Sequence, residues 1–176
     1  HDRLNACAAA ALALSMGASK QSVAEVLSSF EGLAHRMEYV ATVGSLRFFN
    51  DSKATTPHAT IAALSGFTSA VLIVGGRNKG IDLSGLKTLA PALAGVVAIG
   101  ETSSVLTELF SGLVPSLAAN SMEEAVSQAA QLAEASDADV VLSPACASFD
   151  WYPNYVERGN DFKRVVEQLK NEAGLS

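Results

Sequence analysis

Residues 70–82 read AVLIVGGRNKGID, an unbroken apolar run from Ala70 to Val74 followed by two glycines and several charged side chains. A run this short and this apolar predicts a β-strand buried on both faces, as in a parallel sheet covered by helices. A polar loop directly after such a strand lies at the carboxyl edge of the sheet, where α/β proteins bind their ligands. The stretch therefore predicts both the fold class and the edge at which to look for function.

The rest of the second half of the chain alternates between strand and helix patterns around this run. Strands are expected over 37–43 and 46–49, which form a hairpin around Gly44 and Ser45, and over 96–99, near 117, and over 140–142. Helices are expected over 57–64, 83–93 (interrupted by Pro91), 103–110, 122–135 (opened by a capping box of Ser121 and Glu124) and 155–170 (capped by Asn154 with Glu157). The pattern predicts an α/β protein with a Rossmann-like, mostly parallel sheet flanked by helices.

Two helices are expected ahead of this alternation. The first covers residues 4–16, and the second runs to about Phe30 from a capping box of Ser22 and Glu25. The composition changes over 31–36, so we predict a boundary between residues 1–32, the helical end of a preceding domain, and residues 33–176. Because residue 1 is histidine rather than methionine, we expect a part of the protein to precede it.

Composition argues against several classes of protein. Of the 176 residues, 49% are hydrophobic, which suits a packed core, and the formal net charge of -6 argues against a nucleic-acid partner. No apolar run approaches the roughly 18 residues of a membrane span. Two distant cysteines form no disulfide framework, and the three scattered histidines with no C-x-x-C pair predict no zinc site.

The loop over residues 50–57, NDSKATTP, follows a predicted strand and precedes a predicted helix. It can bind an anion through Lys53 and the backbone N–H groups of the helix start. It can equally be a plain polar connection in which Thr55 or Thr56 caps the helix.

The loop over residues 75–82 also leaves two readings open. Its paired glycines would let the backbone approach a ligand, and Arg77 with Lys79 could meet a carboxylate or a phosphate. It could instead be a glycine-rich turn with solvated charges. It matches neither G-x-G-x-x-G nor the phosphate-binding loop G-x-x-x-x-G-K-[ST].

A third loop, SPACASFD over residues 143–150, follows the last predicted strand. Ser148 could hydrogen-bond a bound carboxylate, and Cys146 could be a nucleophile with His35 or His58 as its base. A buried, inert cysteine is the commoner role. His35 and Arg36 lie at the predicted boundary, either as an interdomain ligand site or as a surface pair, and Asn5 near a helix start suits a cap.

Taken together, five stretches resemble the Mur ligase family. They are HDRLNACAAA at 1–10, GLAHRMEYV at 32–40, NDSKAT at 50–55, GGRNKGIDL at 75–83 and LSPACASFDWYPNYVERGNDF at 142–162. They occur in the family's order and cover nearly the whole chain. The pair NDSKAT and LSPACASFD is similar to the family member that adds D-glutamate.

The resemblance implies a bacterial, cytoplasmic, ATP-dependent ligase of peptidoglycan precursor synthesis. It would join D-glutamate to UDP-MurNAc-L-alanine through an acyl phosphate. Residues 33–176 would be its C-terminal domain, and residues 1–32 the end of its central ATP-binding domain. The phosphate-binding loop and the magnesium ligands would lie outside this sequence, so the chain alone is expected to be inactive. The resemblance implies a monomer with small-molecule substrates as partners, and neither nucleic acid nor a membrane is expected as a partner.

The resemblance also implies roles for individual residues. The D-glutamate contacts would be Lys53, Thr55, Lys79, Ser148, Phe149 and Tyr155. Contacts to ATP would come from Asn5, His35, Arg36 and Asp51. No catalytic residue and no metal ligand is expected in this chain. Three alternatives stay open: another amino-acid-adding ligase similar to folylpolyglutamate synthase, a non-catalytic nucleotide- or protein-binding α/β module, and a Cys or Ser hydrolase.

Overall fold

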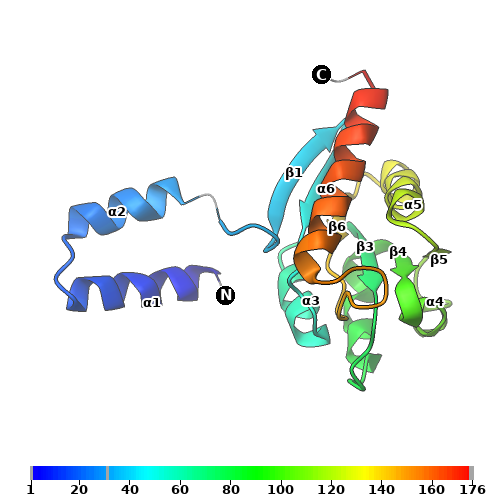
Figure 1. The fold of residues 1–176 in the computed structure, drawn as a ribbon, viewed down its shortest axis with the longest axis horizontal. Coiled ribbons are helices and arrows are strands. Elements are labelled where there is room, and N and C mark those ends of the chain that lie inside the picture. Colours follow the sequence, from blue (N-terminus) through cyan, green and yellow to red (C-terminus); the bar gives the residue numbers. More distant parts are fainter. Residues whose placement is uncertain (1, 31, 175–176) are drawn as a thin grey trace. The chain divides into compact units, whose positions relative to one another are not determined.

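The computed structural model describes residues 2–30 and 32–174 and divides the chain into two compact units, His1–Gly32 and Leu33–Ser176. The first unit consists of α1 (Asp2–Ser15) and α2 (Lys20–Ser29), which pack against each other (Figure 1). Two short helices bury little, and none of the side chains described in this unit is fully buried. Large apolar side chains therefore remain exposed on it, among them Leu12, Met16 and Phe30.

The start of α2 differs from the prediction. Ser19 is its N-cap, and the Ser19 hydroxyl accepts the Ser22 N–H at 3.0 Å. The capping box of Ser22 and Glu25 is therefore wrong by one turn, because Ser19 offers the same cap three residues earlier. The Glu25 carboxylate instead accepts a hydrogen bond from the Gln21 side chain.

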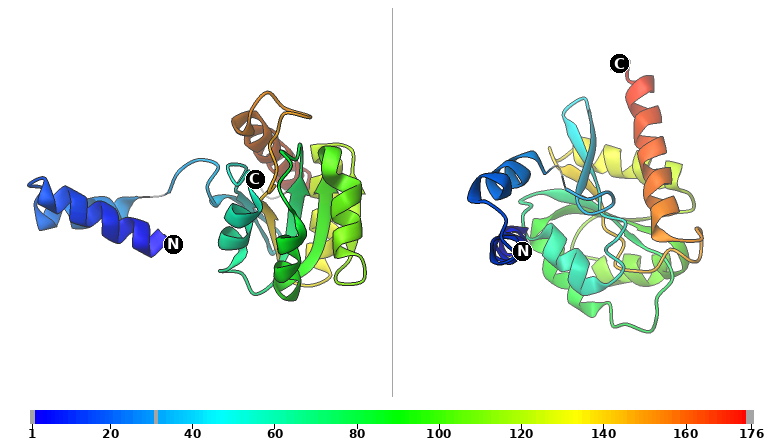
Figure 2. Two further views of the ribbon diagram at one scale, coloured as in Figure 1. Left: turned by 90° about the horizontal axis from the view of Figure 1, so that it is seen from below. Right: turned by 60° about the vertical axis from the view of Figure 1, so that its left-hand side comes forward.

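The second unit is built on one six-stranded sheet in the order β1-β2-β6-β3-β4-β5 (Figures 1 and 2). All neighbours are parallel except β1 and β2, which form the predicted hairpin. The strands are β1 (Glu38–Val43), β2 (Leu46–Asn50), β3 (Ala70–Gly75), β4 (Leu93–Ile99), β5 (Ser116–Ala119) and β6 (Asp139–Leu142).

Helices cover both faces of this sheet. On one face α5 (Met122–Glu134) and α6 (Tyr155–Glu172) pack over side chains such as Val71 and Ile73. On the other face lie α3 (Pro57–Leu64), the short 3-10 helices η1 (Ser84–Ala92) and η2 (Gly100–Thr102), and α4 (Ser103–Phe110). Leu72 and Val74 face this second layer. Every residue of β3 is buried, which confirms the Rossmann-like α/β prediction made from residues 70–74.

The segment over 83–93 is not the predicted α-helix. Residues Ser84–Ala92 form a 3-10 helix with Pro91 inside it, and Leu93 already belongs to β4. Proline has no N–H to donate and clashes with the preceding turn, so an α-helix could not continue through Pro91 to residue 93. The strand consequently begins three residues before the predicted Val96.

Three predicted helix starts are confirmed. The Ser121 hydroxyl accepts the Glu124 N–H at 3.1 Å, and Asn154 Oδ1 accepts the Glu157 N–H at 2.9 Å. Of the two threonines offered as the cap of α3, Thr56 fills the role, with Pro57 as the first helical residue. Thr55 is therefore not needed for capping.

The position of β6 in the sheet decides where the loops meet. It lies between β2 and β3, and the chain leaves it for α6 on one face. The chain leaves β2 and β3 for α3 and η1 on the opposite face. Open α/β sheets bind ligands beside such a reversal, at the carboxyl ends of the strands. None of the described helices is long and apolar enough to cross a bilayer.

Candidate functional site

The three polar loops singled out in the sequence meet at the carboxyl edge of the sheet. The β6 loop (residues 143–154) contacts both others: the Ala145 N–H donates to the Ala54 carbonyl at 2.9 Å. Ala147 and Arg77 exchange two backbone hydrogen bonds of 2.8 and 3.0 Å. Ala145 and Ala147, only two positions apart on the β6 loop, thus hold the two other loops: the β2 loop (residues 51–56) and the β3 loop (residues 76–82).

The paired glycines at the end of β3 have a structural role that differs from one of the two readings left open above, in which they let the backbone approach a ligand. Gly75 and Gly76 have φ values of 127° and 134°. A Cβ on Gly75 would lie 2.1 Å from the Ile99 carbonyl oxygen, and a Cβ on Gly76 would lie 2.2 Å from that of Ala147. The glycines therefore let neighbouring backbone, rather than a ligand, approach closely.

Lys53 projects from the β2 loop over an aromatic ring. Its Nζ lies 4.0 Å from the ring centroid of Tyr155, the first residue of α6. Such a cation–π contact fixes the ammonium while leaving its N–H donors free for a carboxylate. Thr55, two residues further on, is half-buried, and its hydroxyl makes no hydrogen bond to the described residues.

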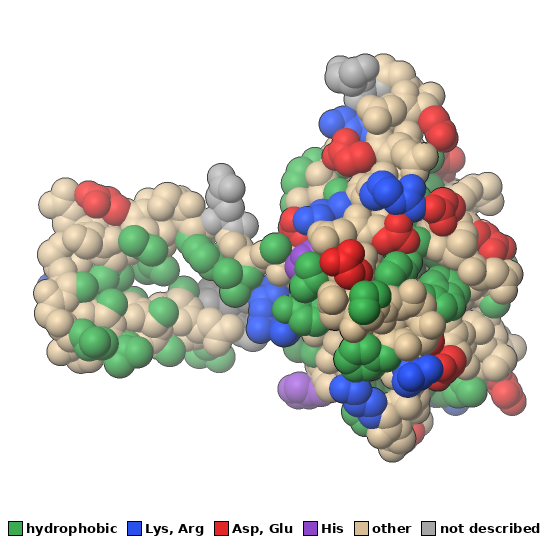
Figure 3. Space-filling model, viewed as in Figure 1, with side chains coloured by type: hydrophobic (Ala, Val, Ile, Leu, Met, Phe, Trp, Pro, Cys, Tyr) green, Lys and Arg blue, Asp and Glu red, His purple; other side chains and the backbone are tan. Residues whose placement is uncertain are grey.

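Lys79 and Phe149 form a second, more exposed pair. The Lys79 Nζ lies 5.7 Å from the Phe149 ring, which is 53% exposed. Figure 3 shows Lys and Arg side chains beside hydrophobic ones below the foot of α6. Ser148, next to Phe149, is buried, and its hydroxyl has no hydrogen-bond partner among the described residues. The six residues predicted to contact D-glutamate thus all lie on the loops at this edge or on the first residue of α6.

Arg158 belongs to this edge and was missed by the sequence analysis. It is 1% exposed, and its guanidinium donates to the Ser52 hydroxyl at 3.0 Å, the Ser52 carbonyl at 2.9 Å and the Cys146 carbonyl at 3.1 Å. Burial lowers the pKa of Arg158 to about 10, against the opposing field of Asp150, so the side chain stays charged at neutral pH. The sequence around Arg158 predicts an ordinary helix. Nothing in it marks this side chain as buried, because an arginine in a helix is usually solvated.

His35 lies in a buried polar cluster behind the β2 loop. Asn50 accepts the Ser52 N–H through Oδ1, so its Nδ2 faces His35 Nδ1 at 3.0 Å and the Glu38 carboxylate at 3.0 Å. The Nδ1 atom of His35 is therefore an acceptor, and the ring proton sits on Nε2. The His35 carbonyl also accepts the Lys53 N–H at 3.1 Å, which joins the segment before β1 to the β2 loop.

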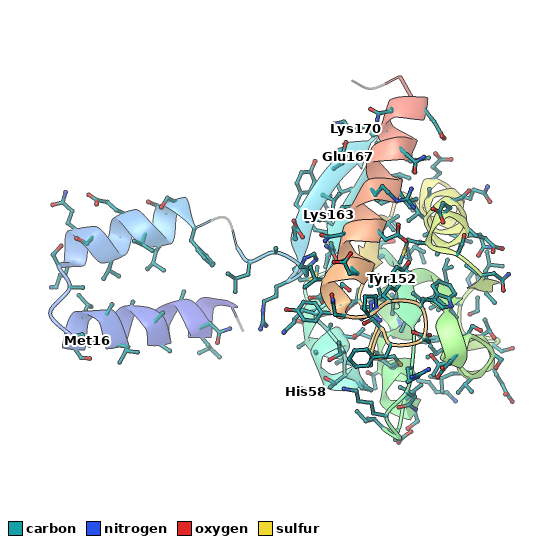
Figure 4. The ribbon with its side chains drawn as sticks, in the orientation of Figure 1. Met16, His58, Tyr152, Lys163, Glu167 and Lys170 are labelled. Atoms are coloured by element: carbon teal, nitrogen blue, oxygen red, sulfur yellow. The ribbon has the colours of Figure 1, made fainter. Side chains whose placement is uncertain are left out.

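The pKa of His35 lies below its usual value because of burial and the nearby Lys163, with Glu38 opposing. Lys163 donates from α6 to Glu38 at 3.0 Å (Figure 4). A histidine with a lowered folded pKa contributes its full stability above the unfolded value of about 6.5. That contribution is lost as the pH falls from there through the folded pKa.

We accordingly expect the free energy of unfolding to fall between pH 7.5 and pH 5.0, and His35→Gln to flatten this dependence. Urea unfolding at several pH values in this range checks it. His58→Gln is the matched control, since His58 lies exposed on α3 (Figure 4). A pH dependence that survives His35→Gln unchanged would contradict the assignment. Glu38 does not interfere, because its own pKa is lowered, in spite of burial, by the His35 N–H and Lys163 and so titrates below this range.

The residues predicted to contact ATP differ in burial and in hydrogen bonding. Arg36 is exposed, and its side chain has no hydrogen bond or ion pair with the described residues, while Asn5 is exposed on α1. Asp51 is buried: its carboxylate accepts the Met37 N–H at 3.3 Å and the Ser143 hydroxyl at 2.8 Å. In this arrangement Asp51 ties the β2 loop to β6, and its contact to a ribose stays a prediction.

Cys146 has the properties of a structural cysteine. It is 2% exposed, burial raises the pKa of its thiol, and its Sγ lies 3.8 Å from the Thr102 hydroxyl. No histidine is hydrogen-bonded to it among the described residues. A thiol that resists ionisation is a poor nucleophile, so the geometry argues against a cysteine hydrolase.

Neither a metal cluster nor a charged pocket competes with the loop edge in the described part of the chain. No group of three or more His, Cys, Asp or Glu side chains there could hold a metal ion. A groove of about 440 Å³ lies between α3 and η1, at the amino ends of β3 and β4, and is lined by Ile61, Leu64, Phe67, Leu89 and Pro91 among others. It carries no charged side chain, so the loop edge remains the candidate site.

Comparison with known proteins gives the chain's relatives. Residues 35–146 match the family described as Mur ligase, glutamate ligase domain. The chain is 44% identical over 171 residues to a UDP-N-acetylmuramoylalanine–D-glutamate ligase of Methylococcus capsulatus, covering 96% of this chain and 37% of that protein. It is 42% identical over 176 residues to the enzyme of the same name in Shewanella violacea (98% and 38%). It is 38% identical over 170 residues to that of Aquifex aeolicus (95% and 41%).

The chain thus spans between 37% and 41% of the length of these relatives. The family match over residues 35–146 includes the hairpin, all strands of the sheet, the β2 and β3 loops and the start of the β6 loop. The chain therefore belongs to the Mur ligase family.

Proposed function

We propose that this chain is the D-glutamate-binding part of a ligase that joins D-glutamate to UDP-MurNAc-L-alanine at the expense of ATP, in peptidoglycan precursor synthesis. Residues 33–176 would be the C-terminal domain of that ligase, and residues 1–32 the end of the ATP-binding domain. The names of the relatives support this, and so does the geometry of the loop edge. We propose the bacterial cytoplasm as its location and a monomer as its state.

One observation carries the proposal: the two lysine-bearing loops are both held by the same β6 loop, which itself bears Ser148. Two ammonium groups suit a dicarboxylate, since charge-assisted hydrogen bonds are stronger than neutral ones. The hydroxyls of Thr55 and Ser148, which have no partner among the described residues, can add donors. The Tyr155 and Phe149 rings limit where the lysines point.

The proposed chemistry asks little of this chain beyond binding and orientation. ATP supplies the phosphoryl group that converts the carboxylate of UDP-MurNAc-L-alanine into an acyl phosphate. The D-glutamate amine attacks the acyl carbon, the bond from that carbon to the phosphate oxygen breaks, and phosphate leaves as the amine loses its proton. Holding both carboxylates of D-glutamate aims its amine at the acyl carbon, and such positioning supplies much of the rate enhancement in a step of this kind.

The residues present fit ATP in part, and we propose that the magnesium ligands lie outside this sequence. The exposed guanidinium of Arg36 suits a phosphate, and we propose that His35 and Asn5 lie near the nucleotide. Among the described residues, no group of three or more acidic, cysteine or histidine side chains could hold a metal ion. The sequence has no G-K-[ST] loop, and we expect the isolated chain neither to hydrolyse ATP nor to form the amide.

The proposal is tested by a chimera in which this chain replaces the matching segment of the Methylococcus capsulatus ligase. We expect turnover that depends on ATP, UDP-MurNAc-L-alanine and D-glutamate. L-glutamate, D-aspartate and other amino acids serve as competing substrates. Preference for another amino acid, as in a ligase similar to folylpolyglutamate synthase, would overturn the D-glutamate assignment. Nucleotide binding by the isolated chain that no amino acid affects would favour a non-catalytic module, and turnover by the isolated chain would contradict the expectation that it is inactive alone.

A further inference from the structure

Arg158 is the largest fully buried side chain described, and it has no acidic partner. None of the described carboxylates forms an ion pair with it, and its donors go instead to Ser52 and to the carbonyl of Cys146. A buried cation held by no ion pair, with only the longer-range field of Asp150 to offset its burial, is costly to keep, and nonpolar side chains of similar size would pack more favourably there. Its presence therefore calls for a reason other than stability.

The three acceptors belong to two different loops. Ser52 lies in the β2 loop, directly before Lys53, and Cys146 lies in the β6 loop, two residues before Ser148. The planar guanidinium donates to both loops at once: Nη2 alone bonds the Ser52 carbonyl at 2.9 Å and the Cys146 carbonyl at 3.1 Å. Arg158 thus fixes the distance between the backbone that carries Lys53 and the backbone that carries Ser148.

Ser52 extends this bridge to the aromatic side of the site. Its hydroxyl accepts from Arg158 Nε at 3.0 Å and donates to the Tyr155 carbonyl at 2.8 Å. Tyr155 is one helical turn before Arg158, and its ring lies against the Lys53 ammonium. The missing side chain of Gly76 also leaves room for the guanidinium, since a Cβ there would lie 3.2 Å from Arg158 Nη1.

We propose that Arg158 is a positioning residue for the amino-acid substrate: it sets the spacing of the β2 and β6 loops and places a fixed positive charge beneath the substrate carboxylates. The proposal rests on the proposed function for the identity of that substrate. A lysine could supply the charge, but its single ammonium cannot bridge two carbonyls and a hydroxyl in one plane. Arginine is therefore the side chain that suits both tasks.

The kinetic test uses Arg158→Met, Arg158→Lys and Ser52→Ala in the chimera described above. We expect Arg158→Met to raise the KM for D-glutamate at least about tenfold, since small displacements of positioning groups have effects of this size. The KM for the UDP-precursor should change less than about twofold, because neither loop carries a residue assigned to that substrate. The KM for ATP should rise less than that for D-glutamate, because Asp51 is the one residue of these loops assigned to the nucleotide. Arg158→Lys should fall between wild type and Met. Ser52→Ala removes one acceptor and should act in the same direction, more weakly.

A second measurement needs no substrate and so separates this proposal from the proposed function. In the 176-residue chain, Arg158→Met should speed amide hydrogen exchange of Ala145, whose N–H bonds the β2 loop, by about tenfold. The amides of β3 should keep their protection.

Faster exchange throughout the sheet would mean a purely structural role and would overturn the proposal. So would an unchanged rate at Ala145, or equal changes in all three KM values. A chimera that uses a different amino acid overturns the D-glutamate assignment alone, and Arg158 is then judged on the KM for that amino acid.

Discussion

Replacing Lys53 with methionine is expected to raise the KM of the chimera for D-glutamate about 100-fold, the effect typical of removing one partner from a desolvated charge pair. Lys53 is half-buried, and its ammonium lies on the Tyr155 ring, so water does not fully replace the lost contact to the substrate carboxylate. The KM values for ATP and the UDP-precursor should stay near wild type. Steady-state kinetics with each substrate varied in turn measures all three.

Two further variants make this test specific. Lys87→Met removes a lysine that lies exposed on η1, and it should leave the D-glutamate KM unchanged. Lys79→Met should raise it by about tenfold, less than Lys53→Met, because the Lys79 ammonium is more exposed and a solvated contact contributes less. If Lys53→Met raised all three KM values alike, the side chain would have a general structural role and its assignment to D-glutamate would be wrong.

The second large effect concerns stability: Gly76→Ala should lower the free energy of unfolding by about 3 kcal/mol. Gly76 has a φ of 134°, where a side chain is strained, and its new Cβ would lie 2.2 Å from the Ala147 carbonyl oxygen. Neither that carbonyl nor Gly76 can move freely, because Ala147 pairs with Arg77 and the Gly76 backbone is held by Thr102. Urea unfolding followed by circular dichroism measures the loss.

Gly80→Ala is the matched control for this prediction. Gly80 lies in the same loop and also has a positive φ, 78°, but a Cβ there would meet nothing within 4 Å. It should cost only about 1 kcal/mol, the backbone strain alone. Equal losses in the two variants would show that strain rather than the close approach of Ala147 requires the glycine at position 76.

The two residues with the largest expected effects, Lys53 and Gly76, lie on loops that are far apart in the chain but joined in the fold. Lys53 and Gly76 lie 23 positions apart, yet Ala145 and Ala147 of one loop hold the segments that contain them. Arg158 adds a third connection from inside α6. Substitutions at this edge are therefore expected to separate into those that touch substrate and those that disturb the spacing of the loops.

The local signals in the sequence were sufficient for most of the framework. The apolar run of residues 70–74, the hairpin around Gly44 and Ser45, and the caps at Ser121 and Asn154 each depend on neighbours within a few residues, and the structure confirms them. The errors also have local causes. Ser19 competes with Ser22 for the same cap, and Pro91 stops an α-helix from reaching residue 93.

The fold class, the edge of the sheet where polar loops collect, and the family could all be predicted from the order of the residues alone. Periodicity, capping and ordered motifs are properties of contiguous residues, and they can be read without coordinates. Three further features become visible only in the folded chain: Gly75 and Gly76 accommodate backbone, Asp51 and Cys146 are buried, and Arg158 joins two loops. These roles depend on β6 entering the sheet between β2 and β3, a pairing of distant segments that no short stretch of sequence encodes.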